Sequence, residues 1–458
     1  MNRSIESSAD AGEPGMVQAS MLEAEREAHA GTKARLKLLE QSLSRYSPHE
    51  MLGILGKSSV IDVELGNHAE KFMSVLFADI RDFTTLSEVM SPQQTFDMIN
   101  SYLVTMSPVI SAHHGIIDKY IGDAIMALFP DSADAAVQAS LSLLGRLDDY
   151  NTGRKRAGYR PIRIGIGVNT GLLMLGMIGS QNRMEGTVIS DAVNIAARLE
   201  SLTKEYGIPL LISEHTLYGL ADPGRLDIRY LGRAKVRGKS RAESIYEVYN
   251  HDAPAVRECK LETSDEFDEA IAYFQLKQIA RAQTIFERIV QKNPEDAPAK
   301  VYQSRCQLYL KHQVHEDTGE LLQNMIWNED YRIGIDGIDR DHQHLLGMIN
   351  ALVTAVRSDE GNHDIKEMLV EIAKEVREHF DYEEMLMVEH QYPFRVEHMA
   401  QHAAYRNSIN RLLCGLQIQV DKRDYLVLRI NRLMLEWLVN HTIQIDRHLA
   451  RFLKERGV

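Results

Sequence analysis

The sequence is poor in cysteine and in long apolar runs, and it has no excess of positive charge. Its three cysteines are far apart and form no Cys-x-x-Cys pair, which excludes a disulfide scaffold and a cysteine zinc site. No run approaches about 18 consecutive apolar residues, and the polar first 15 residues lack the apolar core of a signal peptide. The 52 Lys and Arg against 65 Asp and Glu leave a net charge of −13, which disfavours a nucleic-acid partner. These absences predict a cytoplasmic protein without a transmembrane segment.

What the sequence does contain is ordinary for a folded protein, apart from its histidines. A hydrophobic content of 44% and a charged content of 26% argue against wholesale disorder, and 458 residues predict about three domains. Of 18 histidines, nine lie in residues 327–458, together with both tryptophans, Trp327 and Trp437. This concentration of histidines indicates a metal site, and the spacing between the histidines tests that prediction.

The N-terminal part of the chain predicts a helix rather than a domain. Residues 1–15 read as a disordered leader, and residues 16–67 as a helix followed by a connector. Leu36, Leu39 and Leu43 follow the rhythm of a coiled-coil seam. The seam is short, so a single surface helix is the alternative.

Residues 68–250 alternate strands and helices, which predicts an α/β domain with mixed strand pairing. The run KFMSVLFADI predicts a buried strand, and IIDKYIGDAIMALF predicts a hairpin that turns at Gly122-Asp123. A second strand pair is expected around Thr170-Gly171. The stretch SDAVNIAARLESLTKEYG predicts a helix that ends near Gly207.

The remainder of the chain is predicted to be helical. Within residues 251–326, Ala282, Phe286 and Pro294 match the second helix of a tetratricopeptide repeat, although a plain helical linker is the alternative. Because such repeats need about three units to stand alone, this pair should pack on a neighbouring domain. Residues 327–458 predict an all-α four-helix bundle.

Two aspartates in the α/β region are placed where carboxylates can meet a ligand. Asp79 follows a buried strand in FADIRDFT, and Asp123 lies at the turn of KYIGD. Taken singly, either would ordinarily be a cap or turn residue. Together they suit two Mg²⁺ or Mn²⁺ ions, which prefer oxygen ligands and pair with phosphates in phosphoryl transfer.

Three cationic or amide side chains are suited to bind the negative charge of the phosphates in such a reaction. Asn194 and Arg198 are four residues apart in SDAVNIAARLE, so they share a helix face. A guanidinium beside an amide donor suits a phosphorane-like charge, although a surface arginine is the ordinary interpretation. Lys239, in VRGKS, could supply a point charge to a triphosphate.

These motifs together resemble the catalytic domain of class III nucleotidyl cyclases, over roughly residues 70–250. The ordered set is FADIRDFT, KYIGDAIMALF, RMEGTVISDAVNIAARLE and VRGKS. The resemblance implies a ferredoxin-like α/β fold. It also implies that Asp79 and Asp123 hold the two metal ions with help from the backbone carbonyl of Ile80.

The same resemblance assigns the remaining roles. Asn194 and Arg198 would stabilise the transition state, and Lys239 would contact the terminal phosphates of the substrate. The two positions that select the base in this family match Lys119 and Thr187, which suit the acceptor N1 and the donor N6 of adenine. The sequence therefore resembles an adenylate cyclase, with a guanylate cyclase as the alternative.

The family's site forms between two domains, with the metal aspartates on one and the base and transition-state residues on the other. Because this chain carries the complete set, the resemblance implies a homodimer with two equivalent sites.

The histidines of residues 327–458 follow ligand spacing. His379 and Glu383 are four residues apart, as are His398 and His402, so each pair shares a helix face. With His342 and His441, four helices would each project ligands toward one axis, as metal sites in helical bundles require. Imidazole and carboxylate ligands suit iron, zinc or manganese.

This region resembles hemerythrin through IDRDHQHLL, HFDYEEMLM, YPFRVEHMAQH and WLVNHTIQID. The resemblance implies a di-iron, oxygen-bridged centre that binds O₂, with nitric oxide as an alternative ligand. Its ligands would be His398, His402 and His441 on one iron, His342 and His379 on the other, and Glu383 and Asp446 between them. His441 and Asp446 are five residues apart, which one ideal α-helical face does not accommodate.

The whole sequence thus predicts a cytoplasmic adenylate cyclase that converts ATP to 3′,5′-cyclic AMP and pyrophosphate under control of a di-iron domain. Two alternatives stay open. The di-iron centre could read nitric oxide or redox state, or it could share the chain without regulating the cyclase.

Overall fold

The computed structural model describes residues 29–36, 49–180, 183–235, 242–312, 329–357, 362–414 and 436–458, with a few single positions near these ranges. The predictions for residues 1–15, Leu39, Leu43 and Lys239 lie outside the described residues. Residues 29–36 are helical and exposed, and Leu36 is 53% exposed. In the part of the chain that is described, no helix combines the length and apolar character needed to cross a membrane.

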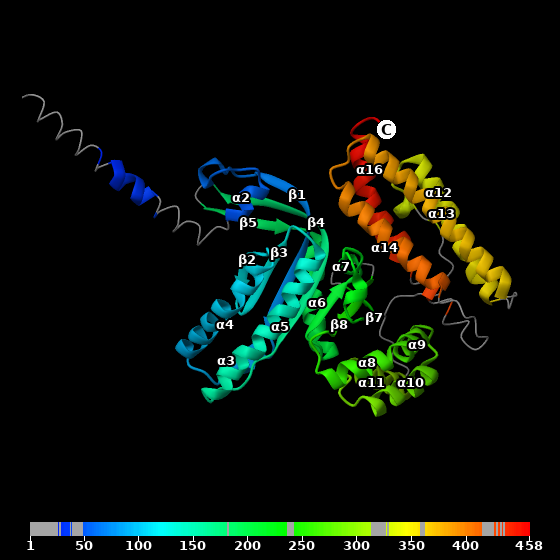
Figure 1. Ribbon diagram of the computed structural model, residues 1–458, viewed down its shortest axis with the longest axis horizontal. Helices are drawn as coiled ribbons and strands as arrows, with labels where there is room; N and C mark the ends of the chain where they lie inside the picture. The colour runs from blue at the N-terminus through cyan, green and yellow to red at the C-terminus, as the bar shows by residue number, and fades with distance from the viewer. Residues whose placement is uncertain are drawn as a thin grey trace, which may run out of the picture. The chain divides into compact units, whose positions relative to one another are not determined.

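The centre of the chain is a mixed sheet, as the alternation of strands and helices predicts (Figure 1). The strand order is β2-β3-β1-β4-β6-β8-β7, and β5 pairs with β4. β4 and β6 are parallel, whereas β1 and β3, β2 and β3, β6 and β8, and β7 and β8 are antiparallel. The strands are β1 (His68–Ile80), β2 (Ile116–Ile121), β3 (Ala124–Phe129), β4 (Ile164–Ser180), β5 (Arg183–Ile189), β6 (Leu210–Ser213), β7 (Ile228–Lys235) and β8 (Ala242–Val248).

Three long helices cover this sheet, and their starts follow from local capping (Figure 1). Ser91 and Gln94 form a capping box at the start of α4, and Ser132 and Ser190 cap α5 and α6. Gly207 ends α6 with a φ of 70°, as its sequence predicts. The helices are α2 (His49–Ile54), α3 (Phe83–Glu88), α4 (Pro92–Ala112), α5 (Ala133–Arg156), α6 (Asp191–Tyr206) and α7 (Glu214–Tyr218), with short 3₁₀ turns η1 (Val60–Asp62) and η2 (Pro223–Arg225).

The two hairpin predictions have opposite outcomes. The two-residue turn at Gly122-Asp123 is confirmed, and Gly122 takes a φ of 66° there. The turn at Thr170-Gly171 is wrong, because β4 runs through both residues. Gly171 serves close packing instead, since a Cβ there would lie 3.0 Å from the Cβ of Ala192 on α6.

The repeat-like helices pack on the sheet, as an incomplete array must. Tyr302 donates a hydrogen bond to the carbonyl of Leu231 on β7, and both carboxylate oxygens of Asp296 accept from Arg229 at 2.7 Å. Phe286 belongs to the same hydrophobic core as the sheet residues. These contacts confirm the predicted packing on a neighbour. The helices are α8 (Pro254–Glu262), α9 (Ser264–Gln275), α10 (Ile279–Lys292) and α11 (Ala297–His312).

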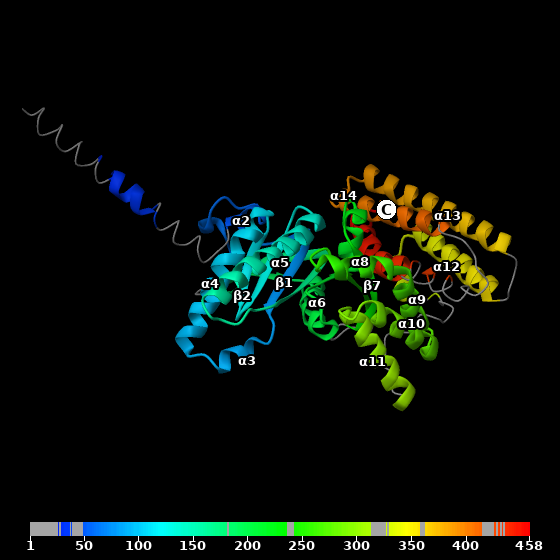
Figure 2. The same ribbon diagram turned by 60° about the horizontal axis from the view of Figure 1, so that its bottom comes forward.

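The C-terminal region is a helical bundle, so the two-part fold class predicted from the sequence is confirmed (Figure 2). Its largest buried side chains include Phe380 and Trp437. The elements are η3 (Glu329–Tyr331), α12 (Asp336–Arg357), α13 (Asn362–Glu389), α14 (Arg395–Cys414), η5 (Glu436–Asp446) and α16 (Arg447–Lys454).

Candidate functional sites

The sheet brings Asp79 and Asp123 together. Ala78 on β1 is paired with Ile125 on β3, so Asp79 lies opposite Ala124 and beside the turn residue Asp123. Asp79 is the second-last residue of β1 rather than just past it, and its Oδ1 accepts a hydrogen bond of 3.0 Å from the amide of Ile80. Two strands that pair antiparallel thus present two carboxylates at one end of the sheet.

The electrostatics of this pair are those of an unneutralised acidic site. Burial, followed by the neighbouring Asp79 carboxylate, raises the pKa of Asp123 to about 7. Among the described residues, its buried Oδ2 has no partner in hydrogen-bonding geometry. Burial and the charge of Asp79 also raise the pKa of Glu200 on α6 to about 7. A divalent cation would offset this repulsion, so the residues present fit the metal ions that the sequence implies.

The other predicted residues lie on separate elements. Lys119 is on β2 after a bulge, and its Nζ is 3.5 Å from a carboxylate oxygen of Asp118. Thr187 is half-buried on β5. Asn194 and Arg198 share the exposed face of α6, and within the described residues neither is hydrogen-bonded to Asp79 or Asp123. Their predicted roles in the reaction therefore stay predictions.

The bundle gathers all seven residues that were predicted to be its ligands. These residues form two groups. Within each group, every member has a ligand atom within 4.8 Å of a ligand atom of each other member, and Glu383 belongs to both groups. Asp446 also reaches both, with Oδ1 3.1 Å from His441 Nε2 and Oδ2 3.5 Å from His342 Nε2. The first group is Glu383, His398, His402, His441 and Asp446, and the second is His342, His379 and Glu383; every member is buried.

A π-helix explains the spacing that an α-helix does not accommodate. Residues Glu436–Asp446 form η5, in which the repeating hydrogen bonds span five residues. Positions five apart therefore recur on one face, and His441 and Asp446 both turn into the bundle. The sequence alone contained no signal for this helix.

The charges within the bundle suit a metal centre. Burial, with the nearby His379, lowers the pKa of His342 to about 3, and burial lowers the pKa of His398 to about 4. Neutral imidazoles keep the lone pairs that ligate a metal. Glu383 Oε2 lies 3.2 Å from His402 Nε2 and Asp446 Oδ1 lies 3.1 Å from His441 Nε2, so two buried carboxylates share one cluster with these imidazoles, which an apolar core tolerates only at high cost without a cation. The residues present fit an iron pair.

Partners outside the ligand set orient three of the histidines, and the sequence analysis missed them. Glu384 Oε1 lies 3.0 Å from His402 Nδ1 and accepts a hydrogen bond of 2.9 Å from Arg406. Asp341 Oδ2 is 3.5 Å from His379 Nδ1, and Gln401 Oε1 is 3.3 Å from His441 Nδ1. Such contacts choose which ring nitrogen faces the metal. Adjacency in sequence to a ligand, as for Glu384 and Gln401, was the available signal.

We expect the metal-free bundle to lose stability on acidification below pH 6.5. His342, His398 and His402 have depressed pKa values in the fold, so the unfolded chain takes up protons first as the pH falls from 6.5 toward 3. Each histidine then costs about 1.4 kcal/mol of unfolding free energy per pH unit in this window. The raised pKa of Glu383 stabilises the fold on acidification and so opposes this loss of stability, but the three histidines outweigh this single carboxyl group.

Thermal unfolding of chelator-stripped protein, followed by circular dichroism between pH 7.5 and 5, measures this loss. A His398→Gln variant should show a shallower pH dependence. An unfolding midpoint that stays constant across this range in the unmodified chain would contradict the expectation.

Comparison with known proteins finds a family match for each of the two regions. Residues 67–249 match the family model of the adenylate and guanylate cyclase catalytic domain, and residues 333–453 match that of the hemerythrin HHE cation-binding domain. An adenylate cyclase of Anabaena cylindrica is 39% identical over 220 residues, which are 47% of this chain and 44% of that protein. The terminal-differentiation-specific adenylate cyclase of Dictyostelium discoideum is 34% identical over 287 residues, which are 61% of this chain and 13% of that protein.

The chain therefore spans less than half the length of either relative. Among solved structures, the adenylyl cyclase CyaB from P. aeruginosa is 33% identical, with 40% of this chain and 95% of that chain covered and a TM-score of 0.36.

Proposed function

We propose that this chain, which carries an adenylate and guanylate cyclase catalytic domain and a hemerythrin HHE domain, is an adenylate cyclase regulated by its own di-iron centre. It would convert ATP to 3′,5′-cyclic AMP and pyrophosphate. The observation that carries the proposal is the adjacent pair Asp79 and Asp123, buried enough to raise the pKa of Asp123 to about 7 and present in one chain with Asn194 and Arg198.

The protein's residues divide the work of the reaction. Asp79 and Asp123, with the carbonyl of Ile80, would hold two Mg²⁺ or Mn²⁺ ions. When bound, these ions supply Lewis-acid chemistry, which lowers the pKa of the ribose 3′ hydroxyl and neutralises phosphate charge. Asn194 and Arg198 would donate hydrogen bonds to the transferring phosphate, where charge builds up in the transition state.

Substrate binding falls to three further residues. Lys239 would contact the terminal phosphates of ATP. Lys119 would donate to N1 of adenine, and the hydroxyl of Thr187 would accept from N6. Because Lys119 already has a carboxylate neighbour in Asp118, its ammonium group is held in place at the edge of β2.

A homodimer would complete the site. Asn194 and Arg198 lie on the exposed face of α6, and among the described residues they make no hydrogen bond to Asp79 or Asp123, which supports a partner that supplies the aspartates. Large apolar side chains exposed on the strands also support a protein partner. They are Tyr120 and Ile121 on β2, Met174 and Ile178 on β4, and Met184 and Ile189 on β5.

The bundle would act as the sensor. His398, His402 and His441 would bind one iron, His342 and His379 the other, and Glu383 and Asp446 would lie between them. When bound, the iron pair supplies redox chemistry and a position for O₂, with nitric oxide as a competing ligand. The buried histidines with lowered pKa values and the two buried carboxylates among them support this assignment.

The test is the rate of cyclic AMP formation by purified full-length protein in the reduced anaerobic, oxygen-exposed and oxidised states of the iron. The proposal expects ATP turnover in every state and a rate that differs between states. Turnover that is the same in all three states would contradict regulation, and absence of ATP turnover would contradict the cyclase activity.

We expect ATP to be strongly preferred over GTP, because a site built around hydrogen bonds rejects a base with the opposite edge, often by about 10⁴-fold. Comparison of kcat/KM for the two nucleotides measures the preference. Replacing Lys119 by Glu and Thr187 by Cys should reduce it, whereas Lys155→Glu, an exposed change at the end of α5, should not. Equal kcat/KM values for ATP and GTP in the unmodified protein would show that the base assignment is wrong.

A further inference from the structure

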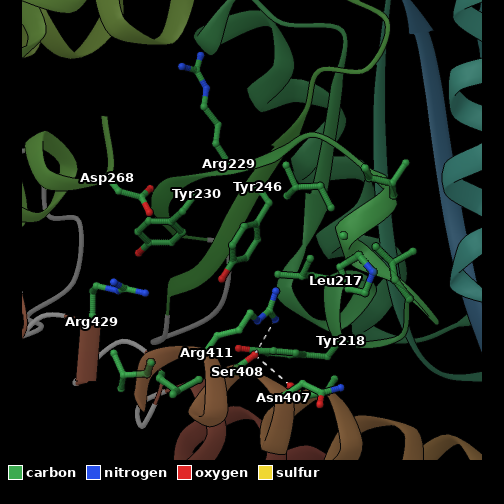
Figure 3. Close-up of a pocket in the computed structure, with 18 of the residues that line it drawn as sticks. Leu217, Tyr218, Arg229, Tyr230, Tyr246, Asp268, Asn407, Ser408, Arg411 and Arg429 are labelled. Carbon is green, nitrogen blue, oxygen red and sulfur yellow. Dashed lines mark hydrogen bonds between the residues drawn. The ribbon is translucent and has the colours of Figure 1, made fainter. Parts of the chain in front are cut away.

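The bundle core contains one residue of the cyclase domain. Tyr218, the last residue of α7, is 8% exposed and belongs to the hydrophobic core of the bundle. Its ring stacks on that of Tyr405 of α14, with centroids 4.7 Å apart and planes inclined by 27°. Figure 3 shows Tyr218 reaching from α7 to the part of α14 that bears Ser408 and Arg411. The bundle therefore contacts the cyclase domain directly and not only through helices α8–α11.

On the bundle side, this stack lies next to the proposed iron ligands. Tyr405 follows His402 by three residues, less than one turn of α14. Its ring centroid is 6.2 Å from that of His441 and 6.5 Å from that of Phe380. Phe380 stacks on His402 at 3.9 Å. Packed rings therefore connect His402 and His441 to Tyr405.

On the cyclase side, α7 is tied to the strand that carries the metal aspartate. Thr216 accepts a hydrogen bond of 3.1 Å from Thr170 on β4, and Thr170 is 2.7 Å from the hydroxyl of Ser74 on β1. Thr216 donates its own hydroxyl hydrogen to the carbonyl of Val168. The three hydroxyls are therefore all satisfied if Ser74 donates to Thr170 and Thr170 donates to Thr216. Ser74 lies five residues before Asp79 on the same strand.

The interface around the stack leaves room for movement. A cavity of about 440 Å³ lies beside it, between the sheet residues Tyr230 and Tyr246 and the α14 residues Asn407 and Arg411 (Figure 3). The aromatic stack thus belongs to the core on one side and borders unfilled space on the other.

A second contact between the same two domains includes an ion pair with a solvent-exposed arginine. Glu70, at the start of β1, lies 3.2 Å from Arg451 and 3.4 Å from His448 of α16, and the ring of Phe72 is 6.1 Å from that of Phe394. The side chain of Arg451 is 57% exposed. Solvent-exposed ion pairs contribute little free energy, so the Glu70–Arg451 pair is a poor candidate for transmission, whereas the His448 side chain beside it is 11% exposed.

We propose that α7 is the docking surface of the cyclase domain for the bundle, and that the Tyr218–Tyr405 stack transmits the state of the iron centre to β1 through Thr216, Thr170 and Ser74. This inference rests on the proposed function, since it assigns a contact to the regulation proposed there. Couplings of this kind change an affinity or a population about 5- to 150-fold.

The test compares cyclic AMP formation in the reduced and oxidised iron states for the full-length protein and its variants. Tyr218→Ala removes the stack, and we expect the ratio of the two rates to fall to near one. Tyr218→Phe keeps the ring and should keep the ratio, and Arg451→Gln should keep it too. A Tyr218→Ala protein that retains the unmodified ratio, or an Arg451→Gln protein that loses it, overturns the inference while leaving regulation intact.

Two further measurements separate the possible failures. Amide hydrogen exchange of residues 214–218 should differ between metal-free and iron-loaded protein, and this difference should vanish in Tyr218→Ala. If Tyr218→Ala does not retain iron, Thr216→Val, which removes the hydroxyl at nearly constant volume, carries the test. The inference is overturned if Thr216→Val keeps the ratio of rates of the unmodified protein and iron loading leaves the amide exchange of residues 214–218 unchanged. A ratio of one in the unmodified protein instead contradicts the proposed regulation itself.

Discussion

Replacing Asp79 or Asp123 by Ala is expected to lower kcat for cyclic AMP formation by about 10³-fold or more, with the fold retained. The two carboxylates meet through the register of β1 and β3, and their repulsion raises the pKa of Asp123 to about 7. Removing either one should relieve that repulsion, so thermal stability without metal should stay equal or rise. Activity should fall nonetheless, because the metal ions lose one of the two carboxylates that would hold them.

Asp82→Asn is the matched control, since Asp82 is three residues further along and forms a surface ion pair with Lys204 at 2.8 Å. It should leave kcat almost unchanged. Retention of more than a tenth of the activity in either Asp79→Ala or Asp123→Ala would contradict the assignment of the metal aspartates.

Mixing the two classes of inactive chain tests the shared site. A heterodimer of Asp79→Ala and Arg198→Ala chains contains one intact site, with the aspartate from one chain and the arginine from the other. If subunits exchange at random, half the dimers are mixed, and activity should recover to about a quarter of the normal value. No recovery after verified exchange would contradict the dimeric site.

Replacing Glu383 or Asp446 by Ala is expected to abolish the iron pair. Glu383 belongs to both groups of ligands, with Oε1 3.5 Å from His379 Nε2 and Oε2 3.2 Å from His402 Nε2. Iron should fall from about two per chain, the stoichiometry of a carboxylate-bridged site, to one or fewer. The charge-transfer absorption that depends on oxygen should disappear with it.

Trp437 offers an independent signal for the same loss. Its ring centroid lies 5.8 Å from that of His342 and 5.7 Å from that of His379, so bound iron should quench its fluorescence. Glu378→Gln, a change near Lys374 on the surface of α13, is the matched control and should keep both the iron and the quenching. Stoichiometric zinc with no oxygen-dependent spectrum in the unmodified protein would show that the centre is not di-iron.

Local patterns in the sequence were sufficient for much of the fold. The turn at Gly122-Asp123 and the end of α6 at Gly207 follow from backbone conformations that glycine favours. Thr170-Gly171 has the same local chemistry, yet β4 continues through it, and a Cβ at Gly171 would lie 3.0 Å from the Cβ of Ala192 on α6, a tight contact that glycine avoids. A dipeptide cannot distinguish a turn from a close helix contact, since only the packed structure contains the neighbour.

The chemistry of both candidate sites was determined by the sequence itself. Carboxylates at a strand end and a hairpin turn, and imidazoles spaced by four along helices, follow from the order of residues because strands and helices repeat at fixed intervals. The tertiary structure alone decided the rest. The π-helix that turns His441 and Asp446 to one side depends on packing around the ligand cluster, and the stack of Tyr218 on Tyr405 joins residues 187 positions apart. Neither is a local property, because each exists only where distant elements are already packed together.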